Sequence, residues 1–140
     1  MKFTGIVKQH LGRGKQLGFP TANVEAPTDI EDGLYLAWTN TDHQVRPSEK
    51  LPSLVFIGAN ETFDEKERGA EIYIIDFDGN LYGKVLEVEI IKKLRPVIKF
   101  SSSHMLIQQM KSDVAEARRF FKKLKARTAC HLPTTFCRAV

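Results

Sequence analysis

The chain has 140 residues, of which 42% are hydrophobic and 27% charged, so we expect a single globular domain rather than a two-domain enzyme. The net charge of +4 conceals a strong polarity: residues 1–91 carry 9 basic and 15 acidic side chains (net −6), and residues 92–140 carry 12 and 2 (net +10). No signal peptide and no run of about 18 apolar residues occurs, so we expect a cytoplasmic protein that does not enter a membrane.

Up to about residue 92, short apolar segments alternate with Gly, Pro, Asn and Asp, which predicts an all-β barrel or sandwich. Asp78-Gly79-Asn80 supplies the positive φ angles that a tight turn needs. We therefore predict that residues 72–77 and 81–91 pair as a hairpin. The expected strands are 3–7, 34–39, 54–58, 70–77 and 81–91.

A glycine-rich segment, Gly12-Arg13-Gly14-Lys15-Gln16-Leu17-Gly18, is the first candidate site. Glycines let backbone N–H groups approach phosphate oxygens closely, and Arg13 and Lys15 would offset the phosphate charge. Its G-x-G-x-x-x-G spacing differs from the dinucleotide fingerprint, and the Gly-Lys-Ser/Thr of a P-loop is missing. The segment is therefore either a phosphate-binding loop or a plain turn.

Thr21 and Asn23 follow this loop. Phe19 precedes Pro20 and is biased toward extended geometry, so we expect a strand-like segment in which Thr21 and Asn23 share a face. A hydroxyl and an amide oxygen can ligate a hard cation such as Mg²⁺ when phosphate oxygens supply the negative charge. The alternative is that both side chains satisfy backbone groups of a turn.

Glu71 is in line with apolar side chains on one face of the strand expected at 70–77. If that face points into a barrel, desolvation would raise the pKa of the carboxyl group, as suits a general base. If Glu71 lies at the frayed start of the strand, it is a solvated acid. Both interpretations stay open.

After Phe100 the pattern changes to that of one amphipathic helix, with N-cap candidates at Ser101–Ser103. Its apolar face consists of Ile107, Met110, Val114, Ala117, Phe121 and Leu124 and should pack on the barrel. The opposite face carries Lys111, Arg118, Arg119, Lys122, Lys123 and Lys125, and is either a solvated face or, less simply, a nucleic-acid-binding surface. We place the domain at residues 1–127 and leave residues 128–140 as a tail.

That tail contains both cysteines, Cys130 and Cys137. Two cysteines are too few for the disulfide framework of a small secreted domain. His131 between them hints at zinc, but a four-ligand zinc site normally has paired ligands at short, repeated spacing. Incidental thiols are the simpler interpretation.

Several of these motifs, taken together, resemble the riboflavin kinases, the module that phosphorylates riboflavin to FMN. They occur in the order of that family across about residues 3–122, and Gly18-Phe19-Pro20-Thr21-Ala22-Asn23 is the most specific of them. The others are Arg13–Leu17, Gly33-Leu34-Tyr35, Ile57–Phe63, Glu71, Asp76–Gly83, Leu94-Arg95-Pro96, Phe100, and a helix with Gln109 and Asp113.

The resemblance implies a mainly β fold: a six-stranded, antiparallel, Greek-key-like barrel closed by one long C-terminal α-helix. It also implies a monofunctional, ATP-dependent riboflavin kinase that makes FMN but not FAD. The partners would be riboflavin and FMN, ATP and ADP. We expect a monomer without a nucleic-acid or membrane partner.

Carried over by position, the resemblance implies that Thr21 and Asn23 hold Mg²⁺, or Zn²⁺ or Mn²⁺, together with phosphate. Glu71 would be the base that acts on the ribityl 5′-hydroxyl, and the loop from His10 to Gly18 would cover the ATP phosphates. The implied nucleotide-binding residues are His10, Gly12, Arg13, Gly14, Lys15, Thr21, Asn23 and Asn60. The implied flavin-binding residues are Arg95, Phe100, Met105 and Asp113.

Three positions depart from the family pattern: His10 replaces a glycine, Glu61 a proline, and Val97 an acidic residue. A side chain at His10 occupies a place suited to close backbone approach to phosphate. A flavin- or nucleotide-binding module without turnover is therefore an alternative to an active kinase, and a nucleic-acid-binding barrel is a third. Thr21, Asn23 and Glu71 are all intact, which favours an active kinase.

Overall fold

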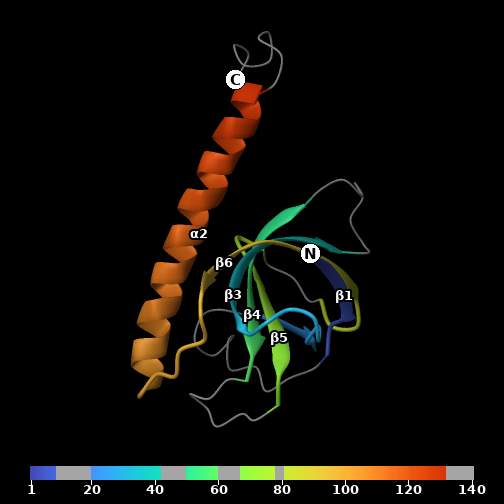
Figure 1. Ribbon diagram of the computed structural model, residues 1–140, viewed down its shortest axis with the longest axis vertical. Helices are drawn as coiled ribbons and strands as arrows, with labels where there is room; N and C mark the ends of the chain where they lie inside the picture. The colour runs from blue at the N-terminus through green and yellow to red at the C-terminus, as the bar shows by residue number, and fades with distance from the viewer. Residues whose placement is uncertain (9–19, 42–49, 60–66, 78–80, 132–140) are drawn as a thin grey trace.

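The computed structural model describes residues 1–8, 20–41, 50–59, 67–77 and 81–131, with side chains described up to Lys125. Within this part of the chain, six strands precede one long helix (Figure 1). The elements are β1 (Lys2–Ile6), β2 (Ala22–Glu25), β3 (Gly33–Thr41), β4 (Leu51–Gly58), β5 (Gly69–Ile74), β6 (Val85–Arg95) and α2 (Ser103–His131).

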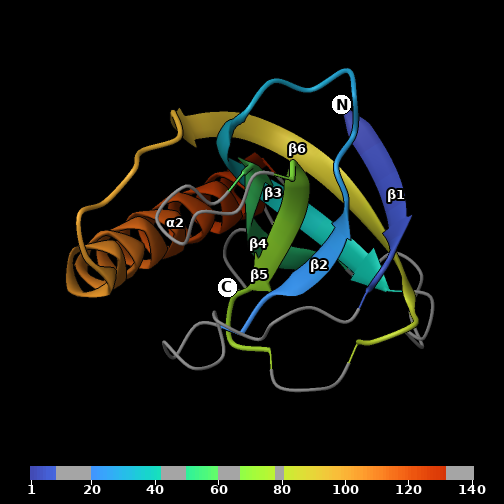
Figure 2. The same ribbon diagram turned by 90° about the horizontal axis from the view of Figure 1, so that it is seen from below.

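The strands form one antiparallel sheet in the order β1-β6-β3-β4-β5-β2, which curls into a barrel (Figure 2). The two outer strands meet where the backbone N–H of Lys8, just beyond β1, donates to the carbonyl of Asn23 in β2 at 2.7 Å. Among the described residues, this bridge is the one that nearly closes the barrel. The prediction of a six-stranded antiparallel barrel with one C-terminal helix is confirmed.

The predicted hairpin between residues 72–77 and 81–91 is wrong. β5 pairs with β4 and β2, and β6 pairs with β1 and β3. β5 ends at Ile74, and Asp76 adopts a left-handed backbone conformation with φ of 59°. The connection leaves β5 before the Asp-Gly turn signal and leads to the far side of β3, so the local signal did not determine the pairing.

Alternate residues of each strand point into the barrel. Ala70, Ile72 and Ile74 of β5 are buried there, and Leu86 and Val88 of β6 are fully inaccessible to solvent. Burial of this apolar surface is the main source of stability for such a domain. The interior core consists of Val7, Ala22, Val24, Ile30, Tyr35, Ala37, Val55, Ile57, Ala70, Ile72, Ile74, Leu86 and Val88.

A second apolar layer lies between the outside of the barrel and α2, which runs along one side and extends beyond it at its C-terminal end (Figure 1). Phe121 contacts Trp38 edge-on, with ring centroids 4.9 Å apart. The predicted apolar helix face is therefore the packed one. The layer consists of Leu34, Leu36, Leu54, Ile75, Ala117 and Phe121, with Trp38, Phe56, Tyr73, Ile91, Leu94, Val114 and Phe120 at its margin.

α2 begins where Ser102 caps it, with the Ser102 hydroxyl accepting from the Met105 N–H at 3.3 Å. It continues to His131 and so enters the segment that we set apart as a tail at residue 128. Among the described residues, α2 and every other helical stretch fall short of the length and apolarity that crossing a bilayer requires.

Candidate active site

The site residues expected on β2 face away from the barrel interior. Ala22 and Val24 are buried in the core, so Asn23 between them and Thr21 directly before the strand point to the outer face. Both are half-buried. Thr21 and Asn23 therefore share a face, as predicted.

Glu71 lies on that same outer face. Its neighbours Ala70 and Ile72 point inward, and its Cα partners on the two adjacent strands are Asn23 and Phe56. It is therefore neither inside the barrel nor at a frayed strand end, the two situations that we considered. It is a half-buried carboxylate in a paired strand, one strand spacing, about 5 Å, from Asn23.

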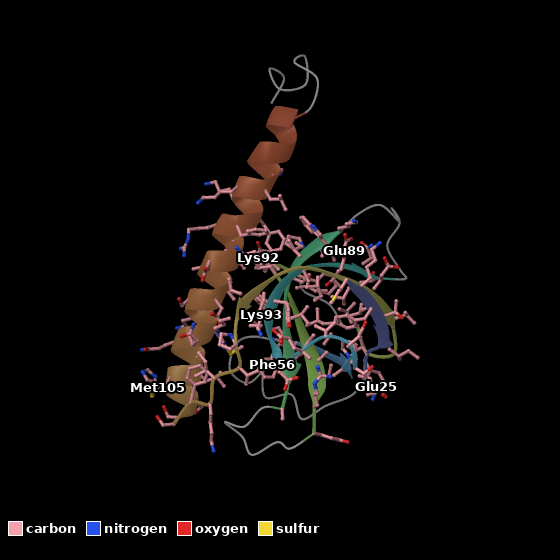
Figure 3. All side chains as sticks on the ribbon, in the orientation of Figure 1. Glu25, Phe56, Glu89, Lys92, Lys93 and Met105 are labelled. Atoms are coloured by element: carbon pink, nitrogen blue, oxygen red, sulfur yellow. The ribbon has the colours of Figure 1, made fainter. Side chains whose placement is uncertain are left out.

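The register continues this row across the sheet. Phe56 pairs with Leu34 of β3, and Leu34 pairs with Arg95 of β6. Direct cross-strand partners share a face, so Asn23, Glu71, Phe56, Leu34 and Arg95 form one transverse row on the outside of the barrel. Glu71 and Arg95 are three strand spacings apart, roughly 14 Å along the sheet. We call these five residues the outer row; Figure 3 labels Phe56 at its centre.

Arg95 ends the outer row in a polar network with α2. Its Nε and Nη2 donate to the carboxylate of Asp113, the Nη2 bond measuring 2.8 Å, and Gln109 Nε2 donates to Asp113 Oδ1 at 2.9 Å. Asp113 is only 3% exposed, and the side chain of Arg95 is 15% exposed. Arg95 and Asp113, two of the predicted flavin-binding residues, are thus in direct contact with each other.

The other two predicted flavin-binding residues lie near the start of α2. Phe100 is half-buried and precedes the helix. Met105 is 51% exposed at the N-terminal end of α2 (Figure 3), and its sulfur accepts from the Ser101 hydroxyl at 3.0 Å. Val97, one of the three departures, lies close to Gly58: a Cβ on Gly58 would be 3.3 Å from Val97 Cγ2.

A clamp on the segment between β2 and β3 was not predicted. Arg68, directly before β5, donates from Nε to Asp32 Oδ1 at 2.5 Å, from Nη1 to the Pro27 carbonyl at 2.6 Å, and from Nη2 to the Ile30 carbonyl. No motif marks Arg68 in the sequence, because its acceptors are mostly backbone carbonyls. We call Arg68, Asp32 and these two carbonyls the Arg68 clamp.

Two further contacts hold the same segment. Lys93 Nζ donates to Glu31 Oε1 at 2.6 Å, and this hydrogen bond raises the pKa of Lys93. The Tyr35 hydroxyl donates to the Glu31 carbonyl at 2.7 Å, and burial raises the pKa of Tyr35 above its ordinary value. The segment is thus attached to β3, β5 and β6.

The donor set at Thr21 and Asn23 fits a hard cation that shares its ligands with phosphate. Both groups are neutral oxygen donors, and Mg²⁺ is commonly bound through few protein ligands plus substrate phosphates and water. Within the described ranges, no group of three His, Cys, Asp or Glu side chains comes close enough to form a self-contained metal site. His10, Gly12, Arg13, Gly14, Lys15 and Asn60 lie outside the described residues.

Comparison with known proteins gives one consistent result. A sequence model of the Flavokinase family, described as riboflavin kinase, matches residues 1–121. Human riboflavin kinase is 34% identical over 123 residues, covering 82% of this chain and 77% of that protein. The trifunctional protein RibF/MnmA of Mycoplasmoides gallisepticum is 34% identical over 122 residues, covering 85% of this chain but only 18% of that longer protein.

The fold also has a close structural counterpart. The crystal structure of riboflavin kinase from Trypanosoma brucei superposes with a TM-score of 0.62 at 24% identity, covering 87% of this chain and 80% of that one. This likeness concerns the barrel and its helix.

Proposed function

The chain belongs to the riboflavin kinase family, and we propose that it transfers the γ-phosphoryl group of ATP to the ribityl 5′-hydroxyl of riboflavin, giving FMN and ADP. The resemblance inferred from the motifs is confirmed at the level of the family. The observation that carries the proposal is the pairing of Asn23 with Glu71 on one outer face, with Thr21 next to them.

Glu71 acts as the general base in this proposal. It accepts the proton of the 5′-hydroxyl as that oxygen attacks the γ-phosphorus and the bond to the β-phosphate oxygen of ATP breaks. The support is positional: a paired, half-buried carboxylate lies one strand away from a residue suited to the metal and phosphates. Phosphoryl transfer demands mainly in-line positioning and charge neutralisation from the protein.

Thr21 and Asn23 would hold the divalent metal through their side-chain oxygens, and we assign Mg²⁺ as that metal. When bound, it would neutralise negative charge on the phosphates of ATP. The family resemblance also assigns Lys15 and Asn60 to ATP. Lys15 precedes the described segment that carries Thr21, and Asn60 follows the one that carries Gly58.

The flavin lies toward the other end of the outer row. Phe56, half-buried beside Glu71, supplies an apolar surface between the base and Arg95. The Arg95 guanidinium donates to the Asp113 carboxylate, so the two side chains present a rigid polar edge to the flavin ring. Phe100 and Met105 are assigned to the same side. Monomeric state, absence of a nucleic-acid partner and cytoplasmic location stay predictions.

The experiment is an FMN-formation assay with purified protein, riboflavin, ATP and Mg²⁺, with flavins separated by chromatography. We expect FMN but no FAD, and complete loss of FMN formation with a chelator until Mg²⁺ is restored. Folded protein that binds flavin tightly but makes no FMN above background would replace the kinase proposal with a binding module.

The role of Glu71 is tested by Glu71→Gln, which keeps the shape of the side chain but removes the base. We expect kcat to fall by about 10²–10⁴-fold with little change in the KM for ATP. Glu87→Gln is the matched control, because Glu87 is an exposed carboxylate on β6, and its kcat should equal that of the wild type. Equal losses of kcat and ATP affinity in Glu71→Gln would make Glu71 a structural residue.

A further inference from the structure

We propose that Arg68 is a positioning residue that keeps β2 in the register placing Asn23 beside Glu71. It does so by holding the segment that leaves β2 against the start of β5. This inference deepens the proposed kinase function and rests on it for its catalytic readout.

The Arg68 clamp connects β2 and β5, the two strands of the site, through contacts other than the backbone hydrogen bonds that pair them. Arg68 directly precedes β5, which carries Glu71, and its three acceptors all belong to the segment that follows β2. A planar guanidinium presents its donors in a rigid fork, so contacts to three separate acceptors fix the segment in position and in orientation.

β2 is the strand that most needs such an anchor. It has four residues, pairs with β5 along one edge, and meets the other edge of the barrel through the Lys8–Asn23 bridge. Short edge strands are held by few hydrogen bonds and slip easily. Immobilising the chain just after Glu25 therefore removes much of the freedom of Asn23 to shift relative to Glu71.

An exposed ion pair alone would not carry this proposal, because such pairs contribute little. The clamp differs in two respects. Two of its three acceptors are backbone carbonyls, so the contact acts on the chain itself. Ile30, whose carbonyl accepts from Nη2, is 3% exposed in the barrel core, so the clamp and the core hold the same residue from two sides.

The test is Arg68→Ala, measured in two independent ways. In the FMN-formation assay, the Mg²⁺ concentration for half-maximal activity should rise about tenfold, as is typical when the support of a metal ligand is removed, while the KM for riboflavin stays the same. By amide hydrogen exchange, residues 22–25 should exchange faster than in the wild type, and residues 51–58 of β4 should not.

Arg68→Lys keeps the charge but not the fork and should give an intermediate Mg²⁺ requirement. Arg118→Ala is the matched control: Arg118 also makes an exposed, two-bonded ion pair, but with Asp76 and on α2, so neither readout should change. If Arg68→Ala fails to fold, Asp32→Asn removes only the charged acceptor and should shift both readouts in the same direction, by less.

An unchanged Mg²⁺ requirement in Arg68→Ala, or exchange that rises equally in β2 and β4, would overturn the proposal and leave Arg68 with a general structural role. If the wild type makes no FMN, the kinase proposal fails separately, because the exchange experiment still reports on β2.

Discussion

The two halves of α2 are attached to the barrel by different chemistry. The N-terminal half, beside the outer row, is held by the network of Arg95, Asp113 and Gln109, whose central carboxylate is buried. The C-terminal half is held by aromatic packing of Phe121 against Trp38 of β3. Apolar packing is non-directional, whereas charge-assisted hydrogen bonds require defined geometry.

We infer from this difference that the two halves of α2 have separate roles, one in stability and one in orientation. We expect the aromatic half to supply most of the free energy that keeps α2 on the barrel, and the polar half to fix its orientation where the flavin is proposed to lie. The exposed pair of Asp76 with Arg118, which belongs to the aromatic half, has two bonds of 2.7 Å, shorter than the bonds of 2.8–3.2 Å in the buried network. Burial, rather than bond length, should decide which of the two pairs matters. Four variants test this view.

Phe121→Ala should have the largest effect on stability. Phe121 is 8% exposed, and its loss leaves a cavity under α2, so we expect the free energy of unfolding to fall by about 4 kcal/mol. Urea denaturation followed by circular dichroism measures it. Riboflavin affinity of the folded variant should stay within twofold of the wild type, whereas a large loss of affinity would contradict the separation of roles.

Asp113→Ala should cause the second-largest loss of stability and the largest loss of riboflavin affinity. It leaves the Arg95 guanidinium, 15% exposed, without its carboxylate, and we expect a loss of about 3 kcal/mol. Riboflavin affinity, measured by fluorescence quenching, should fall as well because Arg95 is free to turn. A stability loss with normal affinity would mean that the orientation of Arg95 does not matter to the flavin.

Gln109→Ala removes one neutral donor from the same carboxylate. Asp113 retains its bonds to Arg95, so we expect the free energy of unfolding to fall by about 1 kcal/mol. Gln108→Ala is the control, since Gln108 is exposed on the same helix and contacts His104 instead. A loss as large as that of Asp113→Ala would show that the network acts as one unit.

The Arg118–Asp76 pair should have the smallest effect, and only a pH-dependent one. The hydrogen bond from Arg118 lowers the pKa of Asp76 in the folded state. The stabilisation is therefore fully present above the ordinary pKa of an aspartate, and it disappears as the pH falls through the lowered pKa. Asp76→Asn, which tolerates the positive φ, should lose this dependence, so its urea midpoint should approach that of the wild type in acid. A difference that grows in acid would contradict the assignment.

Alternation and helical period are local signals, and they predicted an all-β barrel or sandwich, one amphipathic helix and the shared face of Thr21 and Asn23. The choice of a six-stranded barrel came from the family resemblance. The sequence did not tell which face of β5 points inward. Ile72 and Ile74 face the core, while Tyr73 and Ile75 contact the layer under α2, so the strand is apolar on both sides. A strand covered on both faces loses the alternation that distinguishes inside from outside.

The prediction that β5 pairs with β6 was wrong for a related reason. Asp78-Gly79 is a strong local turn signal, but the partners of β6 are set by where β1 and β3 lie in the closed barrel. The outer row is likewise invisible in the sequence, since its five residues come from five strands. The Arg68 clamp was missed because backbone carbonyls carry no sequence signature.

The strand order also determines when the barrel can form. β1 pairs with β6, so the hydrogen bonds of Lys2 through Ile6 await partners at residues 85–89. β2 likewise waits for β5, and of the six described strands only β3, β4 and β5 pair with immediate neighbours in the chain. Contacts of long sequence separation slow folding. During synthesis, the three-stranded meander of β3, β4 and β5 can form first, and β1 stays without its β6 partner until residues 85–89 have been made.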